Sequence, residues 1–397
     1  MTTESMAPKR VVRAESWYND PRIRGIFYQV LLVVVVGGLL WWLGVNAARN
    51  IAATGRGVGF DFLNRTSGFA ISFSLFPVDR SSTYFEMYVA GILNTLLVAV
   101  IGIVLATVLG FTVGIARLSP NWLLRKVATV YVEIVRNVPL LLQLFFWYFA
   151  VLAAMPPVRE SILIPGGGVL NQRGLYLPRP IFDERFWFVV AAAVIGLVAA
   201  FVLRYRARRH LEATGQRQRV FLPALGVFVV LVAAAWLLSG TNLAISFPEL
   251  AGFNYSGGMA VPPTLTALVL GLVIYTSGFI GENVRAGIQS VSHGQTEAAA
   301  SLGLREGDRL RLVIIPQSLR VIVPPLTSQY LNLTKNSSLG AAIGFPELVS
   351  VFPGTTLNQT GRALEVILLT MAVYLTFSLI TSLIMNWYNA RVALTER

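Results

Sequence analysis

"EAAASLGLREGDRLRLVIIPQSL", residues 297–319, is a polar segment between two long apolar stretches. It carries two Glu, one Asp and three Arg, and glycines stand at positions 303 and 307. Charged side chains are costly inside a bilayer, so this segment is expected to lie outside it. The apolar stretches on either side predict the class of protein, and the segment itself indicates the function.

The composition is typical of a membrane protein. The 397 residues are 55% hydrophobic and 13% charged, with a mean hydropathy of +0.65. A soluble protein of this length has too little interior for so much apolar surface, so a polytopic membrane protein is expected. The chain has no Cys, and its two His lie outside the apolar stretches. These facts argue against disulfides and metal sites, and no cofactor is expected.

Eight apolar stretches predict an all-α protein with about eight transmembrane helices, since each approaches the ~20 residues that a spanning helix needs. They lie near 26–46, 88–116, 127–152, 186–203, 220–239, 264–284, 321–343 and 364–386. The first is too long for the apolar region of a signal peptide and is expected to be an anchoring span. The seventh is interrupted by Pro324 and Pro325, which are expected to break its helix.

Basic residues indicate the orientation. The formal net charge is +13, and Lys and Arg gather at the N-terminus and after the second, fourth, sixth and eighth stretches. Residues 204–219 carry six Arg, whereas 240–263 carry neither Lys nor Arg. The positive-inside rule places the basic segments and both termini in the cytoplasm. Several Arg in 48–87 and 153–185, partly offset by acidic residues, depart from the rule. Clusters beside spans do not favour nucleic-acid binding.

The quoted segment predicts a helix, a turn and a second helix. Ser292 and Gln295 have the spacing of a capping box, and a helix from His293 to Leu302 should follow. Gly303 is placed to end it, because glycine adopts the left-handed conformation without a Cβ penalty. The small residues at 298–300 are expected to form a face that another protein can approach closely.

The second half of the segment begins with "REGD", residues 305–308, which predicts a polar turn. A second short helix from Arg309 to Ile315 is expected to run into Pro316. The alternative is an amphipathic helix that lies on the lipid surface and docks no protein.

The spacing of the residues in this segment resembles a known family signature. "EAA", three residues, Gly303, nine residues and "VIIP" resemble the signature of ABC-importer permease subunits, which is E-A-A, three residues, G, nine residues and I-x-L-P. Val313 and Ile315 replace the usual Ile and Leu. In that family the segment is a coupling helix that sits in a groove of the ATPase subunit. The resemblance implies these ATPase-coupling residues: Glu297, Ala298, Ala299, Gly303 and Pro316.

Four further stretches resemble the polar amino acid branch of these permeases, whose members import histidine, glutamine, arginine, glutamate or opines. They are "NTLLVAVIGIVLATVLGFTVGIARLS" (94–119), "YVEIVRNVPLLLQLFFWYF" (131–149), "PQSLRVIVPPLTSQYLNLTKNSSL" (316–339) and "IGFPEL" (343–348). The length and the insertion are most similar to a permease of the proteobacterial general L-amino acid importers. The resemblance implies a five-span type I core in the bacterial inner membrane.

The expected organisation adds an N-terminal span and an inserted helix pair to that core. It comprises a cytoplasmic N-terminus (1–25), a first span with a periplasmic loop (26–87), the first part of the core (88–152), the insertion (153–263) and the second part of the core (264–397), with the coupling helix near 290–318. The resemblance implies as partners two ATPase subunits, a second permease subunit that is a paralogue, and a periplasmic amino-acid-binding protein.

The expected function is ATP-driven import of polar L-amino acids by a non-catalytic subunit. The chain has no G-x-x-x-x-G-K-[ST] phosphate loop, so ATP is expected to bind the partner. A secondary transporter that works without an ATPase is the first alternative, but it predicts inverted repeats, and none is evident. An intramembrane hydrolase needs a nucleophile and a base within reach, yet no His lies in a span.

Polar residues within the spans are candidates for the substrate pathway. Lys335 is the only Lys in an apolar span, and Asn336 and Ser337 follow it. Because a buried Lys is costly to insert, it is expected to line a polar pathway or to pair with an acid such as Glu133. The alternative is a Lys that reaches to the outer interface. Glu133 and Arg136 are spaced to pair on one helical face, where they either line the pathway or form a structural ion pair.

The charge pattern leads to a topology prediction. A reporter fused after Arg209 or Gly294 should report a cytoplasmic location, and one fused near Ser256 a periplasmic location. Reporter activity on both sides of the membrane is the measurement. A reversal at any of the three positions would contradict the eight-span arrangement.

Overall fold

The computed structural model describes residues 21–53, 59–216, 220–241 and 244–392. The chain divides into two units, residues 1–62 and 63–397. The first unit contains α1 (Pro21–Ala53), and the one-turn helix η2 (Asp61–Asn64) lies at the boundary. Helix α1 is about 50 Å long at ~1.5 Å per residue, enough to cross a bilayer. Most of the predicted N-terminal segment, 1–25, lies outside the described residues.

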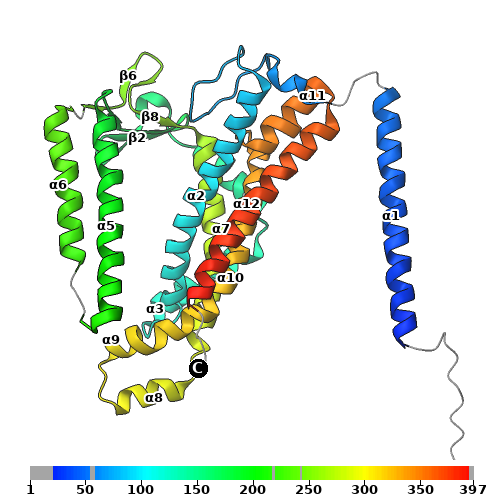
Figure 1. The fold of residues 1–397 in the computed structure, drawn as a ribbon. Coiled ribbons are helices and arrows are strands. Elements are labelled where there is room, and N and C mark those ends of the chain that lie inside the picture. Colours follow the sequence, from blue (N-terminus) through cyan, green and yellow to red (C-terminus); the bar gives the residue numbers. More distant parts are fainter. Residues whose placement is uncertain (1–20, 54–58, 217–219, 242–243, 393–397) are drawn as a thin grey trace, which may run out of the picture. The chain divides into compact units, whose positions relative to one another are not determined.

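The second unit is mainly helical (Figure 1). Its helices are α2 (Tyr84–Ala116), α3 (Trp122–Asn137), α4 (Leu140–Phe145), η3 (Phe146–Leu152), η4 (Val158–Glu160), α5 (Phe186–Thr214), α6 (Phe221–Ser239), α7 (Pro263–Gln289), α8 (His293–Ser301), α9 (Glu306–Arg309), η5 (Leu310–Ile314), α10 (Ile315–Asn336), η6 (Ser337–Ile343), η7 (Ser350–Thr356), α11 (Leu357–Thr360) and α12 (Ala363–Val392).

The described ranges hold seven helices long and apolar enough to cross a membrane, and up to eight if a bent pair counts as one span. This agrees with the eight predicted spans. The bent pair is the third predicted span, in which α3 and the helix from Leu140 to Leu152 meet at 107°. The break falls at Val138, which is extended because a residue before proline avoids the helical region. Pro139 therefore breaks this segment into two helices.

In the seventh predicted span, by contrast, the expected break in the helix is absent. Pro324 and Pro325 lie inside α10, which is continuous from Ile315 to Asn336. Both prolines are on the exposed side of the helix, whereas Ile322 and Leu326 are buried in the core. Burial of these apolar side chains offsets the two backbone hydrogen bonds that the prolines cannot donate. The expected break is thus wrong.

Glycines allow α2 and α7 to pack closely at the centre of the second unit. A Cβ at Gly110 would lie 2.5 Å from Cγ2 of Ile280, and one at Gly114 would lie 2.7 Å from the carbonyl oxygen of Gly281. The two α2 glycines are four residues apart and so share a face. Small residues on a shared face let two membrane helices approach until their backbones touch.

The insertion contains short strands as well as the two predicted helices. A four-stranded antiparallel sheet has the order β1 (Ile162–Ile164), β2 (Gly168–Asn171), β3 (Gly174–Leu177) and β8 (Met259–Val261). β4 (Arg179–Ile181) pairs antiparallel with β5 (Ala244–Ser246) across the intervening α5 and α6, and β6 (Glu249–Ala251) and β7 (Asn254–Ser256) form a hairpin. Since β3 precedes α5 and β8 follows α6, the sheet joins both ends of the insertion. These strands were not predicted from the sequence.

The strands of the insertion and the helices α8 and α9 lie at opposite ends of the spanning helices. Figure 1 places β2, β6 and β8 at one end of the second unit and α8 and α9 at the other. Helices α5 and α6 pack mainly against each other, and α5 is longer than the predicted span 186–203. Helices α5 and α6 of the insertion thus lie outside the packing of α2, α7 and α10.

The close contact of α2 and α7 leads to a stability prediction. Gly114→Leu should lower the melting temperature of the purified protein, because a side chain there must displace the α7 backbone. Such overpacking lowers the free energy of unfolding by about 1–3 kcal/mol or more. Gly226→Leu is the control, since a Cβ at that position meets no atom within 4 Å. Equal melting temperatures for both variants would contradict the packing argument.

Candidate functional site

Helix α8 (His293–Ser301) and the glycine turn that ends it have the predicted form. Helix α8 ends in a left-handed glycine, with φ +73° at Gly303. The Gly303 N–H donates to the carbonyl of Ala300 at 2.9 Å, and the Leu304 N–H donates to that of Ala299 at 3.2 Å. These two bonds form a Schellman motif, which confirms the predicted role of the glycine.

The predicted capping box is not formed. Ser292 is the N-cap residue of α8, but its side chain makes no capping hydrogen bond. The Gln295 side chain is instead bound to Gln317, whose Nε2 donates to Oε1 of Gln295 at 3.3 Å. A contact across 22 residues has replaced the local one, and it joins α8 to α10.

The second half of the segment is more helical than predicted. The expected turn "REGD" is wrong, because Glu306 to Arg309 form α9. A π-helical turn, η5, follows, in which the Ile315 N–H donates to the carbonyl of Leu310. Pro316 lies in the first turn of α10, where a missing N–H is tolerated. The helix therefore continues past Pro316.

The exposed surface of the segment differs from the expected alanine face. Ala299 is buried, whereas Ala298 and Ala300 are exposed, because consecutive residues of a helix point in different directions. Glu297 is exposed, and its Oε1 lies 2.9 Å from Nδ1 of His293. Leu302 is 81% exposed beside the glycine turn. A partner would thus meet Glu297, Ala298 and Leu302.

An ion-pair cluster lies on the last turns of α7, close to the start of α8. Glu282 pairs with Arg117 at the end of α2 and, at 2.5 Å, with Arg285. Nη1 of Arg136 on α3 approaches the same carboxylate to 3.7 Å. We call these four residues the Glu282 cluster. The Arg117 side chain is 9% exposed, whereas those of Glu282 and Arg136 are 23% and 38% exposed, so the cluster joins three helices at a partly solvated site.

The predicted pair between Glu133 and Arg136 is wrong. Arg136 extends toward α7, where its guanidinium lies 5.3 Å from the centre of the Phe279 ring. Val132 and Val135 are the buried residues of this part of α3, and Glu133 is exposed. In the described part of the chain, the Glu133 carboxylate forms no ion pair with Arg136 or with Lys335.

The other predicted pathway residues do not share one polar surface. Lys335 is exposed in the last turn of α10, and Asn336 is partly buried. Ser337 is fully buried, and its hydroxyl donates to the carbonyl of Thr334 at 2.7 Å. Of the three residues, Lys335 is the most accessible to a substrate or a partner.

Sequence analysis missed a buried polar contact between α2 and the loop after η6. Asn94 Nδ2 donates to the carbonyls of Pro346 at 2.8 Å and Phe73 at 2.9 Å. The hydroxyl of Thr95 accepts the N–H of Leu348 at 3.1 Å. Two adjacent polar residues in an otherwise apolar helix were the available signal, since such groups are retained where they have partners.

The same loop buries a carboxylate. Glu347 is fully buried and accepts the N–H groups of Val349 and Ser350, each at 2.7 Å, and the hydroxyl of Tyr374 at 3.2 Å. Glu347 thereby caps η7. Burial raises the pKa of Glu347 to about 7, although these hydrogen bonds act in the opposite direction.

Comparisons with known proteins agree with this architecture. Residues 219–394 match the family "Binding-protein-dependent transport system inner membrane component". The chain is 49% identical, over 95% of its length and 94% of the relative, to the "General L-amino acid transport system permease protein AapQ" of Rhizobium johnstonii. It is 48% identical, over 98% and 99%, to the "Putative amino-acid ABC transporter permease protein YhdX" of Escherichia coli.

A third relative extends the comparison over the whole chain. The "Glutamate/glutamine/aspartate/asparagine transport system permease protein BztB" of Rhodobacter capsulatus is 40% identical over 100% of both chains. At these identities and coverages the family is established. The chain belongs to the amino-acid permeases of ABC transporters, and it is a multi-pass membrane protein.

The Glu282 cluster leads to a second stability prediction. Glu282→Gln should lower the melting temperature by several degrees, because it leaves three Arg without their shared carboxylate at a cost of about 1–3 kcal/mol. Glu133→Gln is the matched control, since the Glu133 side chain is exposed and outside the cluster. If both variants melt at the wild-type temperature, the cluster does not stabilise the fold.

Proposed function

We propose that the chain is the permease subunit through which polar L-amino acids pass from periplasm to cytoplasm, driven by ATPase subunits that dock on α8. One observation carries the proposal: a short exposed helix, closed by a left-handed glycine, follows directly on a spanning helix. Its Glu-Ala-Ala, glycine and proline positions have the spacing of the family signature. The printed names of the three relatives support amino acids as the substrate class.

The coupling route begins at α8. Three residues connect α7 to α8, and the Gln295–Gln317 hydrogen bond connects α8 to α10. The Glu282 cluster then ties α7 to α2 and α3. A displacement of α8 by a closing ATPase would therefore act on several spanning helices together, as in rigid-body transitions of packed elements.

The proposal assigns ATP hydrolysis to the partner, and it includes no catalytic residue and no cofactor in this chain. The remaining partners are two ATPase subunits, a paralogous second permease subunit and a periplasmic amino-acid-binding protein. Both termini lie in the cytoplasm, and the membrane is the bacterial inner membrane. Basic segments between the spans support this orientation.

We assign the substrate pathway to the polar residues that were predicted from the sequence. Amino acids carry an α-carboxylate, and a cation in a medium of low dielectric constant attracts it more strongly than one in water. Lys335 is exposed and accessible, so it is the leading candidate. Asn336 provides a hydrogen-bonding amide beside it. Ser337, Glu133 and Arg136 are the further candidates, although Arg136 already has Glu282 as a partner.

Coupling can be tested at the glycine turn. Gly303→Asp should leave the protein inserted but reduce the uptake per ATP hydrolysed, because a residue with a Cβ is strained at φ +73°. Glu297→Lys should weaken ATPase association by reversing an exposed contact charge. Uptake and ATP hydrolysis are measured together in proteoliposomes with the ATPase and the binding protein.

The control for the turn is Gly307→Asp, which adds the same charge where a Cβ meets no neighbour and no positive φ is required. Full coupling in Gly303→Asp and Glu297→Lys would favour the lipid-surface helix. Co-purification of an ATPase with the wild-type chain separates the proposal from a secondary transporter, which needs none.

Lys335→Met should fold normally and lower the uptake, since Met keeps much of the side-chain length and removes the charge. Lys335→Arg should retain more uptake than Met, although its planar guanidinium differs in shape from an ammonium group. The measurement is uptake in the same proteoliposomes, with ATP hydrolysis as the control. Uptake by Lys335→Met at the wild-type rate would make Lys335 an interfacial anchor outside the pathway.

A further inference from the structure

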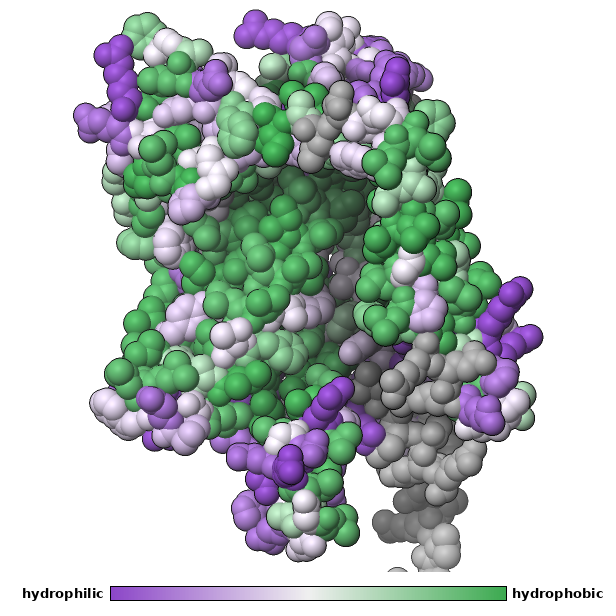
Figure 2. Space-filling view, turned by 90° about the vertical axis from the view of Figure 1, so that its left-hand side faces the viewer, coloured by the Kyte–Doolittle hydropathy of each residue, from purple (hydrophilic) through white to green (hydrophobic). Residues whose placement is uncertain are grey.

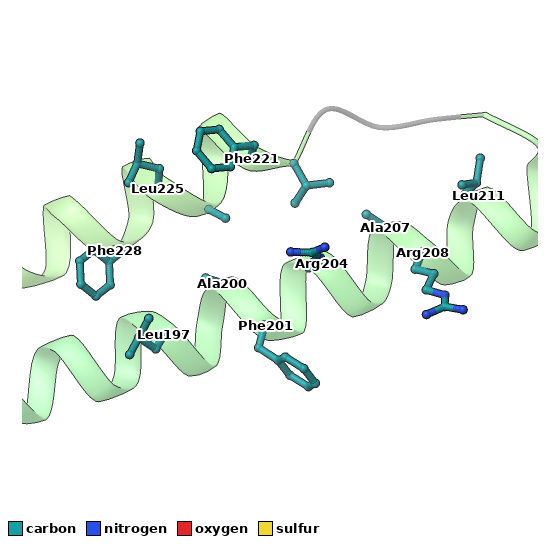
Figure 3. A pocket seen from close by; sticks show the side chains of 12 residues that line it. Leu197, Ala200, Phe201, Arg204, Ala207, Arg208, Leu211, Phe221, Leu225 and Phe228 are labelled. Carbon is teal, nitrogen blue, oxygen red and sulfur yellow. The ribbon is translucent and has the colours of Figure 1, made fainter. Parts of the chain in front are cut away.

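The cavity between the spanning helices of the insertion is mainly apolar. It has a volume of about 830 Å³ and lies between α5 and α6. Figure 3 shows Arg204 directed toward α6 and Arg208 directed away from it, so the two arginines do not form a common polar site. The strands of the insertion, in contrast, carry a surface feature that the transport core does not explain.

The hairpin of β6 and β7 presents an aromatic side chain at its tip. Ala251 pairs with Asn254, so Gly252 and Phe253 form a two-residue turn. Gly252 has φ +66°, as glycine does at the first position of such a turn. Phe253 therefore lies at the end of the hairpin, where it is 80% exposed.

Contacts from the neighbouring sheet hold this tip in place. Nη1 of Arg173, which lies between β2 and β3, donates to the carbonyl oxygen of Phe253 at 3.1 Å. The guanidinium of Arg159 lies 5.9 Å from the centre of the Phe253 ring. The Tyr176 hydroxyl donates to Oδ1 of Asn254 at 2.8 Å. An exposed aromatic residue that is already ordered loses little conformational entropy when a partner covers it.

The charge around the tip favours an acidic partner. Arg159 and Arg173 are both exposed, and neither pairs with an acid within the described residues. An apolar ring between two cations is complementary to a pocket with apolar walls and carboxylates at its rim. Aromatic and arginine side chains are also the residues that contribute most to binding energy in protein interfaces.

The position of the hairpin favours a protein over lipid. In Figure 1 the strand β6 lies beyond the ends of α5 and α6, at the end of the second unit opposite to α8. Figure 2 shows apolar residues across the middle of this face of the molecule and hydrophilic residues at both ends. The apolar band matches the hydrocarbon region of a bilayer, so the hairpin lies in the aqueous phase beyond it. In the proposed orientation that phase is the periplasm.

We propose that the β6–β7 hairpin docks the periplasmic amino-acid-binding protein, with the Phe253 ring in an apolar pocket of that protein and with Arg159 and Arg173 beside its carboxylates. This inference rests on the proposed function, which supplies the binding protein as a partner. Residues 219–394, which match the family of binding-protein-dependent membrane components, include the hairpin. The insertion thereby extends the docking surface beyond the five-span core.

The test measures the affinity of the binding protein for the full-length chain, assembled with its partner subunits in nanodiscs, by surface plasmon resonance. The probe is the binding protein that supports uptake by the wild-type chain in proteoliposomes, loaded with its amino acid. Phe253→Ala should weaken binding by roughly thirtyfold, as the loss of an interface hot spot does. Phe221→Ala is the matched control, because Phe221 is 79% exposed at the opposite end of α6.

The charges are tested with the ring in place. Arg159→Gln/Arg173→Gln should slow association and reduce its dependence on ionic strength. Arg206→Gln/Arg209→Gln, which removes the same charge from the other end of the insertion, should change neither. Wild-type affinity in Phe253→Ala, or an equal loss in both phenylalanine variants, would overturn the proposal. The proposed function would survive either result, since uptake by the wild-type chain tests it separately.

A fluorescent label distinguishes the binding protein from lipid as the occupant. Because the chain has no Cys, Ser256→Cys places a single environment-sensitive fluorophore on β7 of the purified chain before assembly. Its emission should shift to shorter wavelength when the binding protein is added. A shift of the same size on transfer from detergent to nanodiscs, without the binding protein, would show that lipid covers the hairpin and would overturn the proposal.

Discussion

The contact of α2 with α7 through glycine is the constraint on which the rest of the core depends. Gly110 and Gly114 allow α7 to approach until a Cβ would clash with Ile280 and with the backbone of Gly281. In lipid there is little hydrophobic driving force for helices to associate. Close van der Waals contact between small residues therefore provides the favourable energy of association. The same contact brings the end of α2 beside the last turns of α7.

The Glu282 cluster follows from that approach. Arg117 reaches Glu282 because α2 and α7 lie side by side there, and Arg136 reaches it from α3. A partly solvated ion pair adds little net stability compared with apolar packing, but its geometry is directional. The cluster therefore fixes the mutual positions of three helices next to α8, the proposed docking helix. The buried contacts of Asn94 and Thr95 do the same toward the other end of α2.

The insertion packs differently from the core. Helices α5 and α6 pack mainly on each other, and the sheet formed by β1, β2, β3 and β8 joins their two ends. The helix pair therefore makes few contacts with the packed core of α2, α7 and α10.

The sequence alone determined the membrane class, the positions of the spans and the left-handed turn at Gly303, because hydropathy over 20 residues and the missing Cβ of glycine act locally. Tertiary structure decided what depends on distant partners. Gln295 binds Gln317 instead of forming the capping box, and Arg136 turns from the nearby Glu133 to Glu282. Helix α10 passes through Pro324 and Pro325 because the core buries the residues beside them. Local propensities are worth a few kcal/mol at most, so packing and charge pairing across the fold override them.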